Sequence, residues 1–232
     1  MTISSIPQFT YSTENPYYEK LKTYDCCITN EDSELFKGKW TSEVFKNNFL
    51  LNLEIGSGSG EFMVSYLTNH PDENFIGMDY RFKRSFQLMK RLDRLKKNQD
   101  HQFFRFLRAN AERLNFQFCP NEVDQVFYFF PDPWSKRKQL KKRLFRENFL
   151  NTLSEIVKSQ GKFFIKTDHL GYFQHMLDVV NKQNQWTKIF ETSNLYHDYP
   201  DHFLAQYQTS FEKMFLQKKL PIHAMILINI KK

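Results

Sequence analysis

Three glycines within five residues, Gly56, Gly58 and Gly60, follow a nearly continuous apolar run over 49–55 and precede a stretch that predicts a helix. Glycine leaves the backbone bare, so a nucleotide-like cofactor can approach the main chain at such a turn. The spacing is G-x-G-x-G, whereas dinucleotide sites are typically G-x-G-x-x-G. S-adenosylmethionine carries a sulfonium and an ammonium group instead of a pyrophosphate, so the pattern favours it over NAD, and the acid Glu54 is tolerable beside it. A plain strand-to-helix turn is the alternative.

Two further polar residues end the next two predicted strands. Asp79 follows the glycine loop by about 20 residues, which is the position from which an acid accepts hydrogen bonds from a ribose diol. Asn110 comes just after the third strand and is placed to reach the adenine side of the same cleft. Taken alone, Asn110 is typical of a turn.

A proline-rich loop, FFPDPW over 129–134, ends the most apolar of the predicted strands. Its two prolines stiffen the backbone around Asp132, and Trp134 offers a flat apolar face. The loop falls beside the cofactor site in a doubly wound sheet. A Pro-Asp-Pro turn with a surface tryptophan is the alternative.

A basic run begins two residues after that tryptophan. Seven of the eleven residues over 136–146 are Lys or Arg, and none is acidic. Phosphate contacts hold a nucleic acid while an aromatic side chain stacks on an exposed base, so the run indicates a nucleic-acid partner. A solvated charged face is the alternative.

The scaffold that must position these residues is an alternation of strands and helices. Apolar runs predict seven strands, at 49–55, 74–78, 103–107, 124–130, 162–167, 186–191 and 222–230. Helices are expected between them, including one over 140–158 that Gly161 stops. This order is typical of a Rossmann-like, doubly wound α/β fold, a mostly parallel seven-stranded sheet with helices on both faces.

Composition and length set the wider expectations. The 232 residues are 41% hydrophobic and 17% aromatic, which suits a globular domain over 49–232 with an N-terminal extension over 1–48. No signal-like start or membrane-length apolar run is visible, so we expect a soluble cytoplasmic protein without a membrane partner. The three cysteines have no zinc-ligand spacing, and we expect no metal. A net charge of +7 suits a polyanionic partner. We expect a monomer.

These segments together resemble the bacterial tRNA (guanine-N7-)-methyltransferase family over about residues 50–230. The matching parts are LEIGSGSGEF at 53–62, NFIGMD at 74–79, RANAERL at 108–114, FFPDPWSKRKQLKKRL at 129–144, KTD at 166–168 and TSFEKMF at 209–215. The resemblance implies a Rossmann-like enzyme that uses S-adenosylmethionine to methylate N7 of the variable-loop guanine of tRNA, conventionally position 46.

The resemblance also implies roles for individual residues by motif match. Cofactor contacts fall to Glu54, Asp79, Asn110 and Asp132, next to the main chain of Gly56 and Gly58. Substrate contacts fall to Lys136, Asp168, Thr209, Ser210, Phe211 and Glu212, and RNA contacts to Lys138, Lys141, Lys142 and Arg143. The chain departs from the family in two places: Asp79 stands where Glu is common, and Lys219 where glycine is usual.

The chemistry of that reaction suggests a catalytic role for Asp132. Guanine N7 has a lone pair and no proton, so alignment matters more than a strong base. Positive charge moves from the sulfur to the purine during the transfer, and a nearby carboxylate stabilises it, with Trp134 orienting the base. Other classes stay open: a Rossmann-type oxidoreductase or small-molecule methyltransferase, and a non-catalytic RNA-binding protein.

Overall fold

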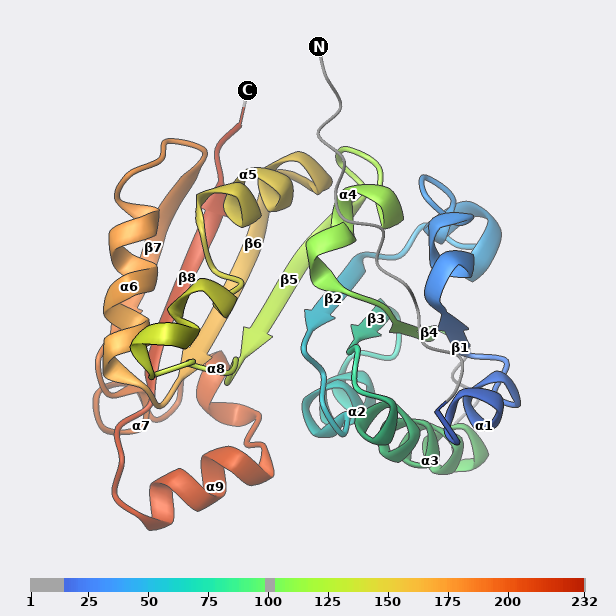
Figure 1. Cartoon of the computed structure of the whole chain (residues 1–232), viewed down its shortest axis with the longest axis horizontal. Coiled ribbons are helices and arrows are strands. Elements are labelled where there is room, and N and C mark those ends of the chain that lie inside the picture. The colour runs from blue at the N-terminus through green and yellow to red at the C-terminus, as the bar shows by residue number, and fades with distance from the viewer. Residues whose placement is uncertain (1–14, 99–102, 232) are drawn as a thin grey trace.

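A single eight-stranded sheet runs through the computed structural model, which describes residues 15–98 and 103–231 (Figure 1). The strand order is β1-β4-β3-β2-β5-β6-β8-β7, and helices lie on both faces. The predicted Rossmann-like, doubly wound, mostly parallel architecture is confirmed. The predicted count of seven strands is wrong by one, because the N-terminal segment adds an edge strand.

The central strands are parallel and covered on both faces. They are β2 (Leu51–Ile55), β3 (Asn74–Met78), β4 (Phe104–Arg108), β5 (Val123–Phe129) and β6 (Val157–Thr167). All residues of β2 and β3 are buried, which explains why their sequences are almost continuously apolar. The strand β8 (His223–Asn229) runs antiparallel between β6 and β7 (Trp186–Thr192).

Two apolar clusters pack the helices against the sheet, and each cluster contains a different set of helices. One cluster packs α1 (Tyr18–Lys22), α2 (Glu61–Asn69), α3 (Phe82–Asn98), α7 (Leu195–Asp198), α8 (Phe203–Gln206) and α9 (Ser210–Gln217). The other packs α4 (Leu114–Gln117), α5 (Glu147–Ile156) and α6 (Leu170–Val180). Within the described ranges, no helix is both long and apolar enough to span a bilayer.

The described part of the N-terminal segment completes the sheet and its core. The strand β1 (Cys27–Thr29) pairs in parallel with β4, with Ile28 opposite Leu107. Further along, Trp40 is fully buried and its indole Nε1 donates a hydrogen bond to the carbonyl of Gln117, 2.9 Å away. Residues 1–14 of the predicted extension lie outside the described residues.

The helix predicted over 140–158 is wrong at both ends. The basic run forms a short 3-10 helix, η4 (Arg137–Lys142), and α5 starts only at Glu147. Adjacent like charges with no acid to pair with disfavour a longer helix there. Gly161 is not a helix stop but lies inside β6, where a Cβ would come within 2.7 Å of the Asp124 carbonyl oxygen.

The carboxyl ends of the parallel strands meet at one edge of the sheet, and α9 lies beyond the ends of β5 and β6 (Figure 1). The loops after β2, β3, β4 and β5 therefore converge there. In an open α/β sheet this edge is where ligands bind.

Candidate functional site

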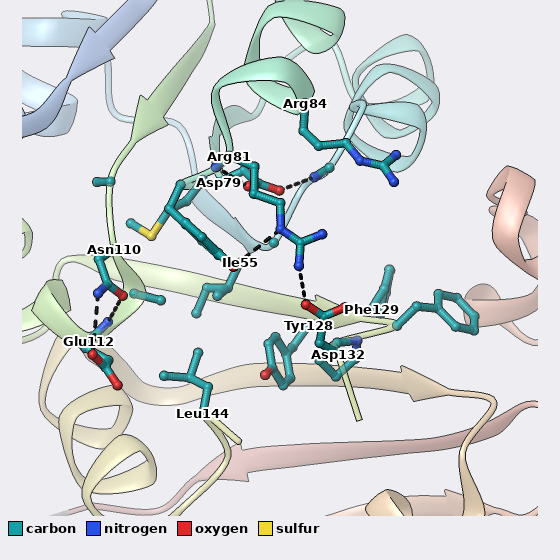
Figure 2. A pocket seen from close by; sticks show the side chains of 18 of the residues that line it. Ile55, Asp79, Arg81, Arg84, Asn110, Glu112, Tyr128, Phe129, Asp132 and Leu144 are labelled. Atoms are coloured by element: carbon teal, nitrogen blue, oxygen red, sulfur yellow. Dashed lines mark hydrogen bonds and ion pairs between the residues drawn. The ribbon is translucent and has the colours of Figure 1, made fainter. Parts of the chain in front are cut away.

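A pocket of about 410 Å³ opens at this edge of the sheet (Figure 2). Its walls include Gly56 and Gly58 after β2, Asp79 after β3, Asn110 after β4 and Asp132 after β5. Five predicted site residues from four separate loops are thus brought together by the parallel strands.

The glycine loop presents bare backbone to this pocket. Gly56 and Gly58 have φ angles of 80° and 55°, in the left-handed region that favours glycine. A Cβ on Gly56 would meet no atom within 4 Å, so the space beside it is open. The amides of Gly56 and Ser57 both donate to the carbonyl of Met78, which fixes the loop to β3. The result is a rigid cradle that a ligand can approach closely.

Asp79 links the glycine loop to the start of α3. Its Oδ2 accepts from the amide of Gly58 at 3.1 Å and its Oδ1 from the amide of Arg81 at 2.8 Å. Burial raises the pKa of Asp79, although these two amides oppose the shift. Each carboxylate oxygen has capacity for a second hydrogen bond, so Asp79 can still accept from hydroxyl groups in the pocket.

Glu54 lies behind the pocket wall rather than in it. Its side chain is 4% exposed, and Oε2 has no hydrogen-bond partner among the described residues. Burial raises the pKa of Glu54 to about 8, Asp79 adds to the rise, and Lys166 opposes it. A buried acid whose Oε2 has no hydrogen-bond partner in the described part of the chain, beside a glycine cradle, can pair with a cationic group of a bound ligand, which favours its ionised form.

Asn110 lies in the pocket wall and also caps a short helix, while its contact to a cofactor stays a prediction. It lines the pocket, and its side-chain oxygen accepts from the amide of Glu112 at 3.0 Å, capping the short 3-10 helix η3 (Ala111–Arg113). The cap fixes the side chain at the carboxyl end of β4 (Figure 2).

Asp132 faces Arg81 across the pocket, and the two form an ion pair (Figure 2). The loop that carries Asp132 has an unusual backbone, because Phe130 and Trp134 adopt φ angles of 50° and 43°. Such angles cost free energy in residues other than glycine, and they occur where surrounding contacts enforce them. Lys142 stands over the Trp134 ring, 4.9 Å from its centroid.

Two arginines of the pocket wall, Arg81 and Arg84, were not among the predicted site residues. The Arg84 guanidinium lies 5.7 Å from the ring centroid of Phe211, so α3 and α9 approach each other over the pocket. The sequence signal that could have identified them is their position, because both residues come within five residues after Asp79, which marks the end of a strand.

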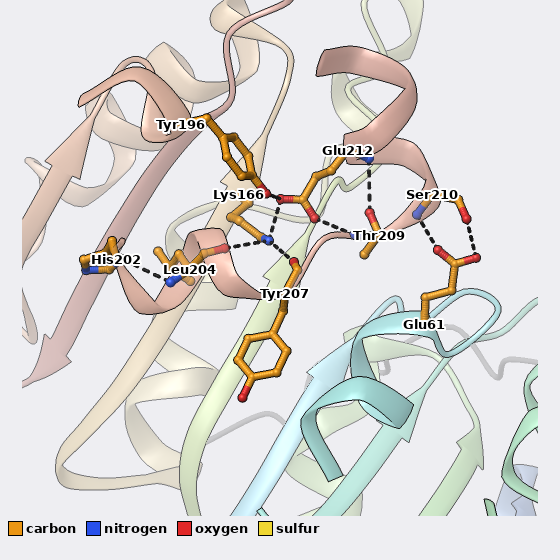
Figure 3. A network of polar contacts seen from close by, with 9 residues as sticks. All are labelled: Glu61, Lys166, Tyr196, His202, Leu204, Tyr207, Thr209, Ser210 and Glu212. Atoms are coloured by element: carbon orange, nitrogen blue, oxygen red, sulfur yellow. Dashed lines mark hydrogen bonds and ion pairs between the residues drawn. The ribbon is translucent and has the colours of Figure 1, made fainter. Parts of the chain in front are cut away.

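The predicted substrate segment 209–212 is largely occupied by contacts within the protein (Figure 3). Glu212 is fully buried, and its Oε1 lies 2.6 Å from the Nζ of Lys166. Its other oxygen accepts from the amide of Thr209, whose hydroxyl accepts from the amide of Glu212, forming a capping box on α9. Ser210 donates to Glu61. Of this segment, Phe211 lines the pocket.

The remaining predicted residues differ in their exposure and in whether they line the pocket. Lys136, Lys138, Lys141 and Lys142 are exposed on or beside η4, and Lys142 also lines the pocket. Asp168 is half-buried just beyond β6 and does not line the pocket. Arg143 differs from its prediction: it is 8% exposed and donates to the carbonyl of Pro133, so it is not part of the exposed basic surface. Lys219 adopts φ 56°, the conformation for which glycine is usual.

The sheet order, the glycine cradle and the acids at the strand ends define the class of Rossmann-like proteins that bind a nucleotide-type cofactor. Residues 48–225 match the family model described as "Putative methyltransferase". A solved structure titled an antibiotic-related methyltransferase superposes with a TM-score of 0.57 at 17% identity, covering 81% of this chain and 90% of that one. This likeness shows the fold.

Curated relatives narrow the class. A tRNA (guanine-N(7)-)-methyltransferase of Oenococcus oeni is 31% identical over 85% of this chain and 89% of its own length, and one of Lachnoclostridium phytofermentans is 32% identical over 86% and 90%. A bifunctional glycosyltransferase/methyltransferase of Fusobacterium nucleatum is 34% identical over 89% of this chain, which spans only 31% of that protein. The chain belongs to the tRNA (guanine-N7-)-methyltransferase family.

Proposed function

We propose that this protein methylates N7 of a guanine in tRNA, with S-adenosylmethionine as methyl donor, and that the target is the variable-loop guanine at position 46. The observation that carries the proposal is the placement of Asp132. It stands at the mouth of a cofactor-type pocket, in the same loop that leads into an exposed run of lysines. Family membership supports both the reaction and the RNA class.

The residues around the pocket fit S-adenosylmethionine. Asp79 has acceptor capacity for the ribose hydroxyls, and the open side of Gly56 admits a ligand against the backbone. Glu54 is a buried acid whose Oε2 has no hydrogen-bond partner among the described residues, and a cationic group bound beside it would favour its ionised form. When bound, S-adenosylmethionine supplies a methyl group on a sulfonium. A solved plantazolicin methyltransferase titled as a complex with SAH has a similar fold, with a TM-score of 0.51 at 13% identity.

The chain's own residues then have distinct tasks. Asp132 places a negative charge where the purine becomes positive, and Arg81 holds that carboxylate toward the pocket. Trp134 and Phe211 offer ring faces at the pocket that can stack on a base and orient it. No residue needs to remove a proton from N7, so alignment is the main contribution to rate.

The lysines of η4 supply the RNA contacts in this proposal. Lys138 and Lys141 are exposed, and Lys142 is both exposed and part of the pocket wall. Positive charge that continues from the surface into the pocket suits a phosphate backbone leading to a flipped-out base. A tRNA substrate supports the predicted cytoplasmic location. The monomeric state and the domain boundary after residue 48 stay predictions.

The direct test incubates the purified protein with labelled S-adenosylmethionine and unmodified tRNA, followed by nucleoside analysis. We expect 7-methylguanosine, and none from a tRNA that carries adenine at position 46. Methylation of that altered tRNA would move the target to another guanine. Binding of tRNA without any methyl transfer would favour the non-catalytic alternative.

A further inference from the structure

The loop after β5 needs external contacts to hold its shape. Phe130 and Trp134, at its two ends, both have left-handed backbone angles, and Asp132 lies between them. The amide of Phe130 is fixed by a hydrogen bond to the carbonyl of Lys166 at 2.8 Å. At the other end of the loop, side chains from outside it contact both neighbours of Trp134, Pro133 and Ser135, and such contacts can hold its strained backbone.

Arg143 holds the residue before Trp134. Its Nε donates to the carbonyl of Pro133 at 2.8 Å, and its guanidinium lies over the ring of Tyr172, 4.7 Å from the centroid. Arg143 is 8% exposed although it belongs to a run of otherwise exposed basic residues. A planar guanidinium can stack and donate sideways at once, which an ammonium cannot do.

His169 holds the residue after Trp134. Its Nε2 lies 2.9 Å from the Ser135 hydroxyl, while its Nδ1 accepts from the amide of Tyr172 at 3.0 Å. Because a ring nitrogen that accepts from an amide carries no proton, the proton of the neutral imidazole is on Nε2 and is donated to Ser135. His169 is therefore no base toward Ser135 in this arrangement; it fastens the loop to the first turn of α6.

We propose that Arg143 and His169 are positioning residues that clamp Trp134 from both sides. Both side chains meet Tyr172, one on its ring and the other at its amide, so α6 is the common anchor. The clamp keeps the strained loop in the conformation that directs Asp132 and Trp134 to the pocket. This role rests on the proposed function for its effect on methyl transfer, but not for its effect on the loop.

Three substitutions each remove a contact of the clamp while keeping the other contributions of the substituted residue. His169→Asn keeps a good helix cap but is too short to reach Ser135. Ser135→Ala breaks the same contact from the other end with little risk to folding. Arg143→Lys keeps the positive charge and loses the stacked guanidinium. Ser159→Ala is the matched control, since Ser159 is exposed and its hydroxyl donates to the carbonyl of Lys231, far from the loop.

Acrylamide quenching of tryptophan fluorescence measures how accessible the tryptophan of this loop is to solvent. Trp40 and Trp186 are 0% and 3% exposed, so the quenchable signal belongs to Trp134. We expect stronger quenching in the three clamp variants than in Ser159→Ala, and no such increase in a Trp134→Phe background. Unchanged quenching in all three would overturn the clamp, whether or not the protein methylates tRNA.

Steady-state kinetics measure how the clamp affects methyl transfer to tRNA. Misplaced reacting groups lower rate more than binding, so we expect kcat to fall by about 10- to 10²-fold in the clamp variants with little change in the KM for tRNA. An Arg143→Lys variant with weaker tRNA binding, a flatter salt dependence and unchanged quenching would identify Arg143 as a phosphate contact and overturn its positioning role. Absence of methyl transfer in the unsubstituted protein would refute the proposed function alone.

Discussion

At the scale of single residues, the carboxylate of Asp132 is paired with an arginine and is also exposed to the pocket. Its side chain is about half exposed, and its pairing with Arg81 crosses the pocket. Ion pairs this exposed contribute only about 0–1 kcal/mol, because water screens them. The carboxylate is thus held in place but remains available to another positive charge that enters the pocket.

Replacing Asp132 with Ala should remove that charge without harming the fold. We expect kcat to fall by at least about 10²-fold, which is the effect of losing one well-placed group that stabilises transition-state charge. Methyl incorporation into tRNA measures the rate, and circular dichroism checks that the variant is folded. Near-normal methylation by a folded Asp132→Ala protein would exclude this residue from the mechanism.

Glu54 should make stability depend on pH. Its pKa in the folded protein is about 8, above the value of about 4.3 expected in the unfolded chain, so folding retains a proton between these limits. The stability contributed by the protonated form is complete below the lower value and is lost as pH rises through the higher one. The free energy of unfolding should therefore fall between about pH 5 and 8, by at most about 1.4 kcal/mol per pH unit.

Urea unfolding across this pH range measures the effect. Glu54→Gln should flatten the dependence, whereas Glu147→Gln, on the exposed first turn of α5, should keep it. A slope that persists in Glu54→Gln would assign the pH dependence to other groups.

Much of the candidate site could be predicted because its residues follow strand ends. Gly56, Asp79, Asn110 and Asp132 each come directly after an apolar run, and parallel strands bring such ends together. The environment of Arg143 could not be predicted, because the sequence shows a charge run but not the ring of Tyr172, 29 residues on, that covers one of its members. The same holds for Glu212, whose partner Lys166 lies in a strand 46 residues earlier.

At the scale of elements, one buried lysine ties α9 to the sheet. The Nζ of Lys166 donates to the carbonyls of Leu204 and Tyr207 as well as to Glu212, and Tyr196 donates to the same carboxylate (Figure 3). Burial lowers the pKa of Lys166, and Glu212 opposes the shift. The side chain satisfies three acceptors at once, so α9 and the segment before it are fixed together.

Breaking this ion pair should be costly. Lys166→Met leaves Glu212 buried without its cation, and removal of one partner of a buried pair costs about 3–5 kcal/mol. The double variant Lys166→Met/Glu212→Leu should recover part of that loss, since no charge is then stranded. Urea unfolding of Lys166→Met, Glu212→Leu and the double variant provides the comparison. A loss of stability in the double variant that equals the sum of the two single losses would mean that the pair itself is not the source of the effect.

The elements themselves were predictable where burial was extensive. Strands β2, β3 and β5 lie close to their predicted ranges, because strands covered on both faces are mostly apolar. The strand β1 has three residues, too few for any periodic pattern, and only its pairing with β4 defines it. The start of α5 was placed too early, because the sequence alone does not show that the basic run before it forms a separate 3-10 helix, η4.

At the scale of the whole molecule, the exposed lysines of η4 contribute to a net charge of +7. Removing one lysine that binds a phosphate should reduce the slope of log affinity against log salt by about 0.7–0.9. We expect this from Lys138→Ala and from Lys141→Ala in tRNA-binding titrations. Lys182→Ala removes an exposed charge beyond the far end of α6 and should leave the slope unchanged. If all three variants kept the salt-dependence slope of the unsubstituted protein, η4 would be only a solvated face.

The place of β8 in the sheet also bears on how the chain is made. In the described sheet β8 joins β7 to β6, with Lys162 opposite Ile228 on one side and Trp186 opposite Asn229 on the other. While a ribosome is still synthesising residues 223–229, β6 has an open edge and β7 has no neighbour within this sheet to pair with. Nascent chains should therefore stay susceptible to aggregation and proteolysis until this last strand has left the exit tunnel and inserted between the two.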